Sequence, residues 1–155
     1  MKTGTVEVAV LVVTHGQLAA ELVAAATTIL GGVELPQLGS LSIGWDQDVD
    51  EARQAIADEV ERTDRGVGVL VLTDMFGGTP TNLSLTFLDD ERVEIVTGVN
   101  LPMVVKSAGL RLKKGADGAE LRRVADEVAS KGAESVIVAS AMLEPRSKSD
   151  DESEA

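Results

Sequence analysis

Residues 6–16 read Val-Glu-Val-Ala-Val-Leu-Val-Val-Thr-His-Gly, and this stretch decides the fold. Val6–Val13 is an almost unbroken apolar run, which is typical of a strand buried on both faces of a parallel sheet. Thr14, His15 and Gly16 follow this run, and a helical pattern begins directly after them. We therefore expect His15 in a turn between a strand and a helix, at the sheet edge where open α/β folds bind ligands.

Four further segments have the composition of strands: Leu38–Ile43, Val67–Thr73, Val93–Thr97 and Ser135–Ser140. Helical patterns separate them, and the alternation of strands and helices predicts βαβ units with right-handed crossovers. The expected fold is α/β, a doubly wound three-layer sandwich around a mostly parallel sheet of about five strands.

Apolar residues at helical spacing predict three amphipathic helices. Their stripes are Leu18, Leu22, Ala25, Ala26 and Ile29; then Val49, Ala52, Ile56 and Val60; then Leu121, Val124, Ala125 and Val128. Thr79-Pro80 has the form of an N-cap followed by proline, so another helix should run to about Leu88. We expect one more short helix from Leu101 to about Leu112, and a loop over Lys113–Ala116.

Residues typical of helix ends flank these segments. Two pairs have the spacing of a capping box, Asp48 with Glu51 and Asp117 with Glu120. Gly31-Gly32 is expected to end the first amphipathic helix, and Gly132 the third.

Composition limits the possible functions. The chain has 155 residues, enough for one domain, and no cysteine, which excludes disulfides and thiolate metal sites and fits a reducing compartment. The net charge of -12 argues against binding to nucleic acid or anionic membranes. No window approaches the roughly 18 apolar residues of a membrane span, and no signal peptide is recognisable. We expect a cytoplasmic protein.

The last segment differs from the rest. Residues 144–155 are rich in serine and acidic side chains and lack apolar periodicity, so they cannot become ordered by burial. We predict one domain over residues 1–143 and a disordered acidic tail over residues 144–155.

Three polar segments should meet at one edge of the sheet, because each follows a predicted parallel strand: residues 14–16, 73–80 and 98–103. His15 is the only histidine of the chain, and Asp74 directly follows an apolar strand. A carboxylate beside a histidine fixes the tautomer of the ring and leaves the other nitrogen free to attack.

The turn Gly77-Gly78-Thr79 complements this pair. Two glycines let backbone amides approach a ligand closely, the helix they open favours anions, and Thr79 adds a hydroxyl. With His15 as nucleophile and Asp74 as its orienting group, these residue types suggest a phosphorylated histidine. We predict no metal and no cofactor.

These segments resemble the enzyme IIA domains of the mannose-type bacterial sugar phosphotransferase system. The resemblance rests on Thr14-His15-Gly16, on Asp74–Pro80 and on Gly98–Met103, and in order and spacing it covers about Val6 to Ser140. It implies a doubly wound sheet whose last strand is antiparallel, in a homodimer that in some relatives exchanges this strand. That would place Ser135–Ser140 at the interface.

The resemblance also implies an activity. His15 would take a phosphoryl group on Nε2 from the histidine-containing phosphocarrier protein, while Asp74 holds Nδ1, and would pass the group to an enzyme IIB component for sugar uptake or for regulation. Thr79 stands where the family usually has serine. No IIB domain follows Ser140 in this sequence, so the acceptor is expected to be a separate chain.

Three alternatives stay open at this point. One is the phosphocarrier subunit that serves dihydroxyacetone kinases, which has a related fold and its own phosphorylatable histidine. Another is a receiver-like signalling module with Asp74 as its aspartate, although the acidic cluster that holds magnesium in such modules is replaced here by Thr14-His15-Gly16. The last is a metal-independent hydrolase with His15 as base.

Overall fold

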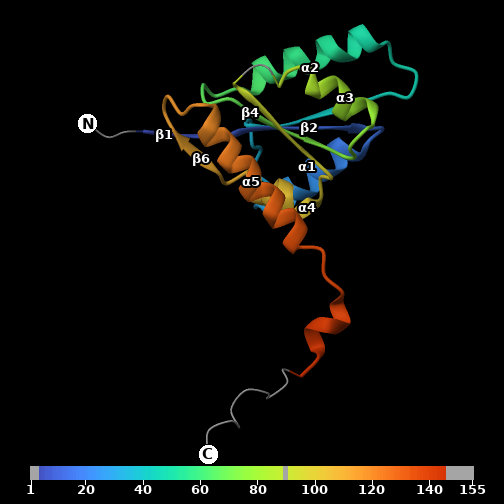
Figure 1. The fold of residues 1–155 in the computed structure, drawn as a ribbon, viewed down its shortest axis with the longest axis vertical. Helices are drawn as coiled ribbons and strands as arrows, with labels where there is room; N and C mark the ends of the chain where they lie inside the picture. Colours follow the sequence, from blue (N-terminus) through green and yellow to red (C-terminus); the bar gives the residue numbers. More distant parts are fainter. Residues whose placement is uncertain (1–3, 89–90, 146–155) are drawn as a thin grey trace, which may run out of the picture.

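A parallel sheet forms the centre of the molecule (Figure 1). The computed structural model describes residues 4–88 and 91–145. The strands of the sheet are β2 (Ala9–His15), β3 (Leu38–Ile43), β4 (Val69–Thr73) and β5 (Val93–Thr97), in the spatial order β3-β2-β4-β5. Every adjacent pair is parallel, so the carboxyl ends of all these strands lie at one edge.

Helices cover both faces of the sheet (Figure 1). One face carries α1 (Leu18–Ile29), α4 (Leu101–Ser107) and α5 (Gly118–Glu134), and the other carries α2 (Val49–Thr63) and α3 (Thr79–Leu85). This arrangement confirms the predicted α/β class and its doubly wound, three-layer architecture.

The core lies on either side of β2 and β4. Val10 and Val12 pack in the cluster under α1, α4 and α5, whereas Leu11 and Val13 pack in the cluster under α2 and α3. All of these side chains are fully buried. The alternation explains why the strand reads as a continuous apolar run, because neither of its faces meets water.

The predicted strand Val6–Val13 is in fact two strands. Residues Thr5–Glu7 form β1, which pairs antiparallel with β6 (Arg111–Lys113), and β2 begins at Ala9 and continues to His15. His15 is therefore the last residue of a strand, paired with Ile43, rather than a turn residue.

The region before α5 was also predicted incorrectly in part. The helix expected from Leu101 to about Leu112 ends at Ser107, and Arg111–Lys113 is a strand, which includes one residue of the predicted loop. Its pairing partner β1 lies more than a hundred residues away in the sequence, and the guanidinium of Arg111 donates to Glu7 across this pair at 2.7 Å. Local periodicity cannot reveal a strand created by such a distant partner.

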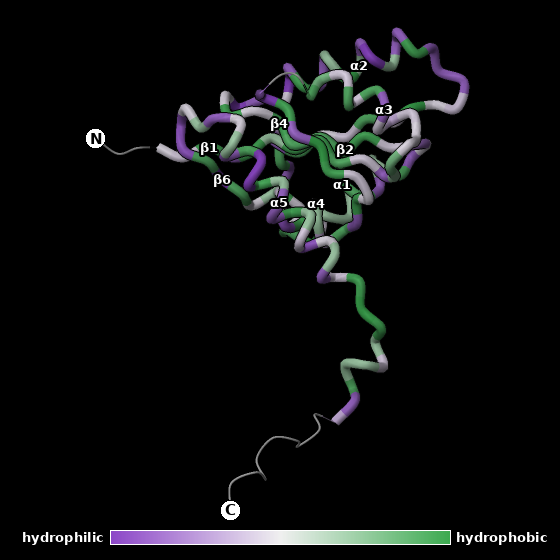
Figure 2. The backbone as a smooth tube through the Cα atoms, viewed as in Figure 1, coloured by the Kyte–Doolittle hydropathy of each residue, from purple (hydrophilic) through white to green (hydrophobic). Residues whose placement is uncertain are grey.

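The predicted strand Ser135–Ser140 is not formed in the single chain. The backbone is extended at Val138, and a 3-10 helix follows over Ala139–Leu143. Figure 2 shows this apolar segment running away from the body of the molecule, and Val136, Ile137 and Val138 are 78%, 62% and 71% exposed. A strand requires a neighbour for its backbone hydrogen bonds, and within the described residues this segment pairs with none.

The apolar stripes predicted from the sequence agree with the buried faces of α5 and α2 better than with that of α1. In α5 all of the predicted residues are buried, and in α2 only Val49 is exposed, at 53%, while Val60 is partly buried. In α1 the prediction is wrong at both ends, because Leu18 and Ile29 are exposed and Ala19 is buried instead. The stripe of α1 is thus rotated toward its small residues, which allow close packing on the sheet.

Most of the predicted helix ends are confirmed. Asp117 and Glu120 form the complete capping box of α5. At the start of α2 only half of the predicted box is present, in which the side chain of Asp48 accepts from the backbone N–H groups of Asp50 and Glu51. Gly31 and Gly32, with φ of 109° and 77°, end α1.

Gly132 has a different role from the predicted one. It lies inside α5, which continues to Glu134, and a Cβ there would be 2.4 Å from Sδ of Met103. This glycine therefore permits the contact between α5 and α4 instead of ending a helix.

The end of the domain is only partly described. Glu144 and Pro145 are exposed, and residues 146–155 of the predicted acidic tail lie outside the described residues, so the domain boundary stays a prediction. Over residues 4–88 and 91–145, no helix combines the length and apolar character needed to cross a membrane.

Candidate active site

His15 lies at the carboxyl edge of the sheet, between the ends of β3 and β4. Gly16 follows with φ of 53°, which turns the chain sharply toward α1. The buried Oγ1 of Thr14 accepts a hydrogen bond from the backbone N–H of Ala19 at 2.7 Å and so fixes the start of α1. The strand and the helix thereby hold the backbone of His15 from both sides.

Asp74 is the partner of His15. Oδ2 of Asp74 accepts a hydrogen bond from the backbone N–H of His15 at 2.9 Å and lies 2.7 Å from Nδ1 of its ring. The side chains of His15 and Asp74 are only 22% and 13% exposed. The structure thus brings together the two residues that the sequence predicts as nucleophile and orienting group.

The Asp74 carboxyl stays ionised in this setting. Burial alone would raise its pKa, but hydrogen bonds from the backbone and ring of His15, the charge that this ring can carry, and the backbone N–H of Met75 hold the pKa below its ordinary value. An ionised carboxylate only accepts hydrogen bonds, so Nδ1 of His15 carries a proton. In the neutral ring, Nε2 then has a free lone pair.

Gly78 packs against the edge of the His15 ring. A Cβ at this position would lie 2.7 Å from Cε1 and 3.4 Å from Nε2 of His15, so only glycine leaves room for the ring. Gly77 has φ of 84° and forms the turn before it. Gly78, rather than the predicted Thr79, is also the N-cap of α3.

Thr79 is the first residue of α3 and is exposed, as is Gly77. The structure therefore brings His15, Asp74 and Gly78 into contact and places Gly77 and Thr79 on either side of Gly78 in the chain. The phosphate-binding role of Gly77, Gly78 and Thr79 remains a prediction.

A pair of buried hydroxyls holds the loop that carries Asp74. Oγ1 of Thr73 and Oγ1 of Thr81 are 2.7 Å apart, and Thr81 also donates to the backbone carbonyl of Met75 at 2.6 Å. Both threonines are almost fully buried. Sequence reasoning missed this contact, for which the only signal is a hydroxyl residue at the end of an apolar strand.

Sequence reasoning also missed Trp45. The indole of Trp45 stacks on the His15 ring with a centroid distance of 5.1 Å and an interplanar angle of 24°. Trp45 follows β3, the strand next to β2, so the available signal was an aromatic residue at the same edge of the sheet as His15.

The third polar segment has a mainly structural use. Asn100 caps α4 by accepting a hydrogen bond from the backbone N–H of Met103, and its side-chain amide donates to the carbonyl of Gly132 in α5. The backbone N–H of Val99 donates to Thr73 at the end of β4. This segment lies at the predicted edge, and its side-chain hydrogen bonds link α4 to α5.

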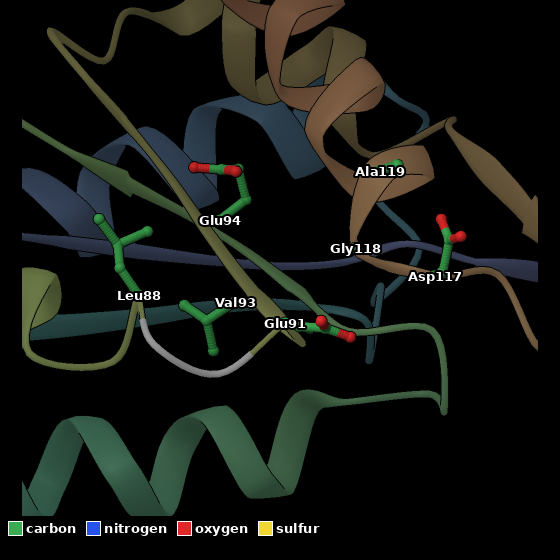
Figure 3. A pocket seen from close by; sticks show the side chains of 7 residues that line it. All are labelled: Leu88, Glu91, Val93, Glu94, Asp117, Gly118 and Ala119. Carbon is green, nitrogen blue, oxygen red and sulfur yellow. The ribbon is translucent and has the colours of Figure 1, made fainter.

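A separate pocket of about 350 Å³ lies at the start of β5, the end of the strand away from the carboxyl edge that carries His15 (Figure 3). Its carboxylates are those of Glu91, Glu94 and Asp117. Two of these carboxylates accept hydrogen bonds from nearby backbone N–H groups: Asp117 caps the start of α5, and Glu94 accepts from the N–H of Ile95. Within the described part of the chain, no group of three or more His, Asp or Glu side chains could hold a metal ion.

Comparison with known proteins shows the family. The family described as PTS system fructose IIA component matches residues 9–125. The chain belongs to this family of phosphotransferase-system IIA components, of the mannose and fructose type. This membership favours the mannose-type interpretation over the dihydroxyacetone kinase subunit and the receiver.

Individual relatives agree with this membership. The mannose-specific EIIAB component of Escherichia coli K12 is 30% identical over 106 residues, which cover 64% of this chain but 31% of that protein. The fructose-specific EIIA component of Bacillus subtilis is 46% identical over 44 residues, or 28% of this chain and 30% of that protein. The chain thus aligns with less than a third of the length of either relative.

Solved structures share the fold. A IIA protein associated with the fucose utilization operon of Streptococcus pneumoniae has a TM-score of 0.73 at 25% identity, covering 89% of this chain and 97% of that one. The mannose/sorbose IIA subunit from Enterococcus faecalis has a TM-score of 0.73 at 22% identity, covering 86% and 95%.

The contact between Gly78 and the His15 ring gives a first prediction. Gly78→Ala should push the ring away from its position beside Asp74, because the new Cβ would overlap Cε1. The ring resonances of the single histidine should therefore shift in a ¹H–¹³C NMR spectrum. Gly77→Ala is the matched control, since a Cβ there meets nothing within 4 Å and only strains the backbone. Equal shifts in the two variants would contradict the packing role of Gly78.

Proposed function

We propose that the protein is a phosphocarrier that works through a phosphohistidine at His15. It accepts a phosphoryl group from the histidine-containing phosphocarrier protein and passes it to an enzyme IIB component on a separate chain, for sugar uptake or for regulation. Family membership supports this role, and one contact carries it: the 2.7 Å approach of Nδ1 of His15 to Oδ2 of Asp74. This contact occupies one ring nitrogen and leaves the other as the nucleophile.

The proposed transfer uses this geometry. The lone pair on Nε2 of His15 attacks phosphorus, the bond from phosphorus to the donor nitrogen breaks, and the donor nitrogen keeps that electron pair. Positive charge develops on the His15 ring, and the ionised carboxylate of Asp74 stabilises it from the Nδ1 side. Because Asp74 lies on the side of the ring away from Nε2, its charge is kept apart from the phosphoryl oxygens.

We assign the phosphoryl oxygens to the turn beside the ring. Gly78 lies against the edge of the ring that includes Nε2, and backbone N–H groups near the start of a helix favour anions. Gly77 lets the backbone turn at this point, and the hydroxyl of Thr79 supplies one more donor. We place this reaction in the cytoplasm, in keeping with a chain that has no cysteine.

We also propose that the protein is a homodimer in which residues 135–140 pair with the sheet of a second copy. Two observations support this. The apolar side chains of Val136, Ile137 and Val138 are exposed in the single chain. In addition, β3 and β5 are the outer strands of the parallel sheet, so each has an edge at which a further strand could pair.

The central prediction concerns His15. His15→Ala should abolish phosphorylation that is labile in acid and stable in base, because the chain has no other imidazole. The test is incubation with phosphoenolpyruvate, enzyme I and the phosphocarrier, followed by mass measurement without acid. Thermal melting should show that the variant remains folded. Undiminished phosphate uptake by the alanine variant would refute the proposal.

Asp74 should matter more for rate than for stability. Asp74→Asn keeps the shape but removes the charge, and the amide can donate to Nδ1 and favour the wrong tautomer. We expect phosphoryl transfer to slow at least tenfold, or about 1.4 kcal/mol in the barrier, with little change in melting temperature.

The matched control for this variant is Asp126→Asn. Asp126 is an exposed carboxylate on α5, where it pairs with Arg122 one helical turn away. Rapid-quench measurement of the two variants separates loss of the His15 contact from loss of one negative charge. Equal rates in both would show that another group orients the ring.

The dimer has its own test. The wild-type protein should sediment as a dimer at micromolar concentration, and Ile137→Asp should sediment as a monomer, because an isolated carboxylate is costly to bury in an apolar interface. A chain that ends at Pro145 is the control and should remain dimeric. A wild-type protein that sediments only as a monomer would contradict the proposal.

A further inference from the structure

Trp45 is a large apolar residue whose position the fold does not require. It is the only tryptophan of the chain and is 81% exposed, so it contributes little to either core cluster. Its main aromatic contact is the stack on His15, at 5.1 Å between ring centroids. Burial in the core therefore does not account for the position of Trp45, whereas the contact with His15 does.

The placement of Trp45 follows from the sheet and from a local turn. Ile43 pairs with His15 across β3 and β2, so the residues that follow β3 lie beside the ring. The turn is closed by hydrogen bonds in both directions between Gly44 and Gln47: the backbone N–H of Gly44 donates to Oε1 of Gln47, and that of Gln47 donates to the carbonyl of Gly44. These bonds hold the backbone on either side of Trp45.

The His15 ring is thereby contacted in three directions. Asp74 holds the Nδ1 edge, Gly78 limits movement at the Cε1 edge, and Trp45 covers one face. A hydrogen bond at Nδ1 alone still permits the ring to tilt about that contact. Stacking opposes this tilt, so the three contacts together fix the direction in which Nε2 points.

We propose that Trp45 is a positioning residue for phosphoryl transfer, which holds the His15 ring by its face and stabilises the positive charge that develops on it. This inference rests on the proposed phosphohistidine. The negative face of an aromatic ring attracts a cation above it, and an indole does so more strongly than a phenyl ring. For an exposed pair this attraction corresponds to about a two- to fivefold change in rate.

The first experiment tests the stack without any phosphoryl transfer. Because the chain has one histidine, its two ring C–H resonances need no assignment among several. Protons over the face of an indole are shielded, so these resonances should move downfield in Trp45→Ala. Val33→Ala is the matched control, since Val33 is 70% exposed and lies in the loop between α1 and β3. Unchanged histidine resonances in Trp45→Ala would overturn the inference.

The second experiment measures transfer from the phosphorylated phosphocarrier as kcat and KM separately. Trp45→Ala should lower kcat about three- to tenfold with KM for the phosphocarrier unchanged, and Trp45→Phe should restore most of kcat. In the wild type, phosphorylation should also change the fluorescence of Trp45, and His15→Ala should lose this response.

The other outcomes are decisive against the inference. A rise in KM alone would mean that Trp45 serves as a docking residue for the partner, and unchanged kcat and KM would mean that the stack has no role in transfer. If the wild-type protein takes up no phosphate, the proposed function itself fails, and this result is distinguishable because it precedes any comparison of variants.

Discussion

The position of the His15 ring depends on one carboxylate oxygen, because Oδ2 of Asp74 accepts hydrogen bonds from both the backbone N–H and Nδ1 of His15. This double contact depends on the parallel register of β2 and β4, in which Val13 pairs with Thr73. His15 and Asp74 lie just beyond that pair, at the same edge of the sheet. Gly78 leaves space for the ring, and Thr81 holds the loop that positions Asp74. The geometry of the site, and with it the proposed chemistry, thus depends on strand pairing in the core and on few residues outside it.

The sequence predicts the elements whose position is determined by burial of apolar side chains. Continuous apolar strands such as β2 and β4 can only be central in a sheet with two covered faces, and the stripe of α5 is equally clear because every member of it is buried. From parallel strands it also follows that His15 and Asp74 end at one edge. The resemblance to mannose-type IIA domains, seen in three short segments of the sequence, agrees with the family match over residues 9–125.

The sequence does not predict what depends on distant or external neighbours. Strand β6 exists because β1 pairs with it, and residues 135–140 have the composition of a strand but find no pairing partner among the described residues. The stack of Trp45 on His15 depends on the shape of a turn closed by a side chain, which periodicity does not encode. Residues 135–140 belong to neither core cluster.

The most direct test of the account is to identify the atom that carries the phosphoryl group. Long-range ¹H–¹⁵N NMR of the phosphorylated protein, labelled with ¹⁵N, distinguishes the two ring nitrogens of its single histidine. The account predicts phosphorus on Nε2 and a proton on Nδ1, held by Asp74. Phosphorus on Nδ1, or on any residue other than His15, would contradict it, because the contact with Asp74 would then have no role in directing the transfer.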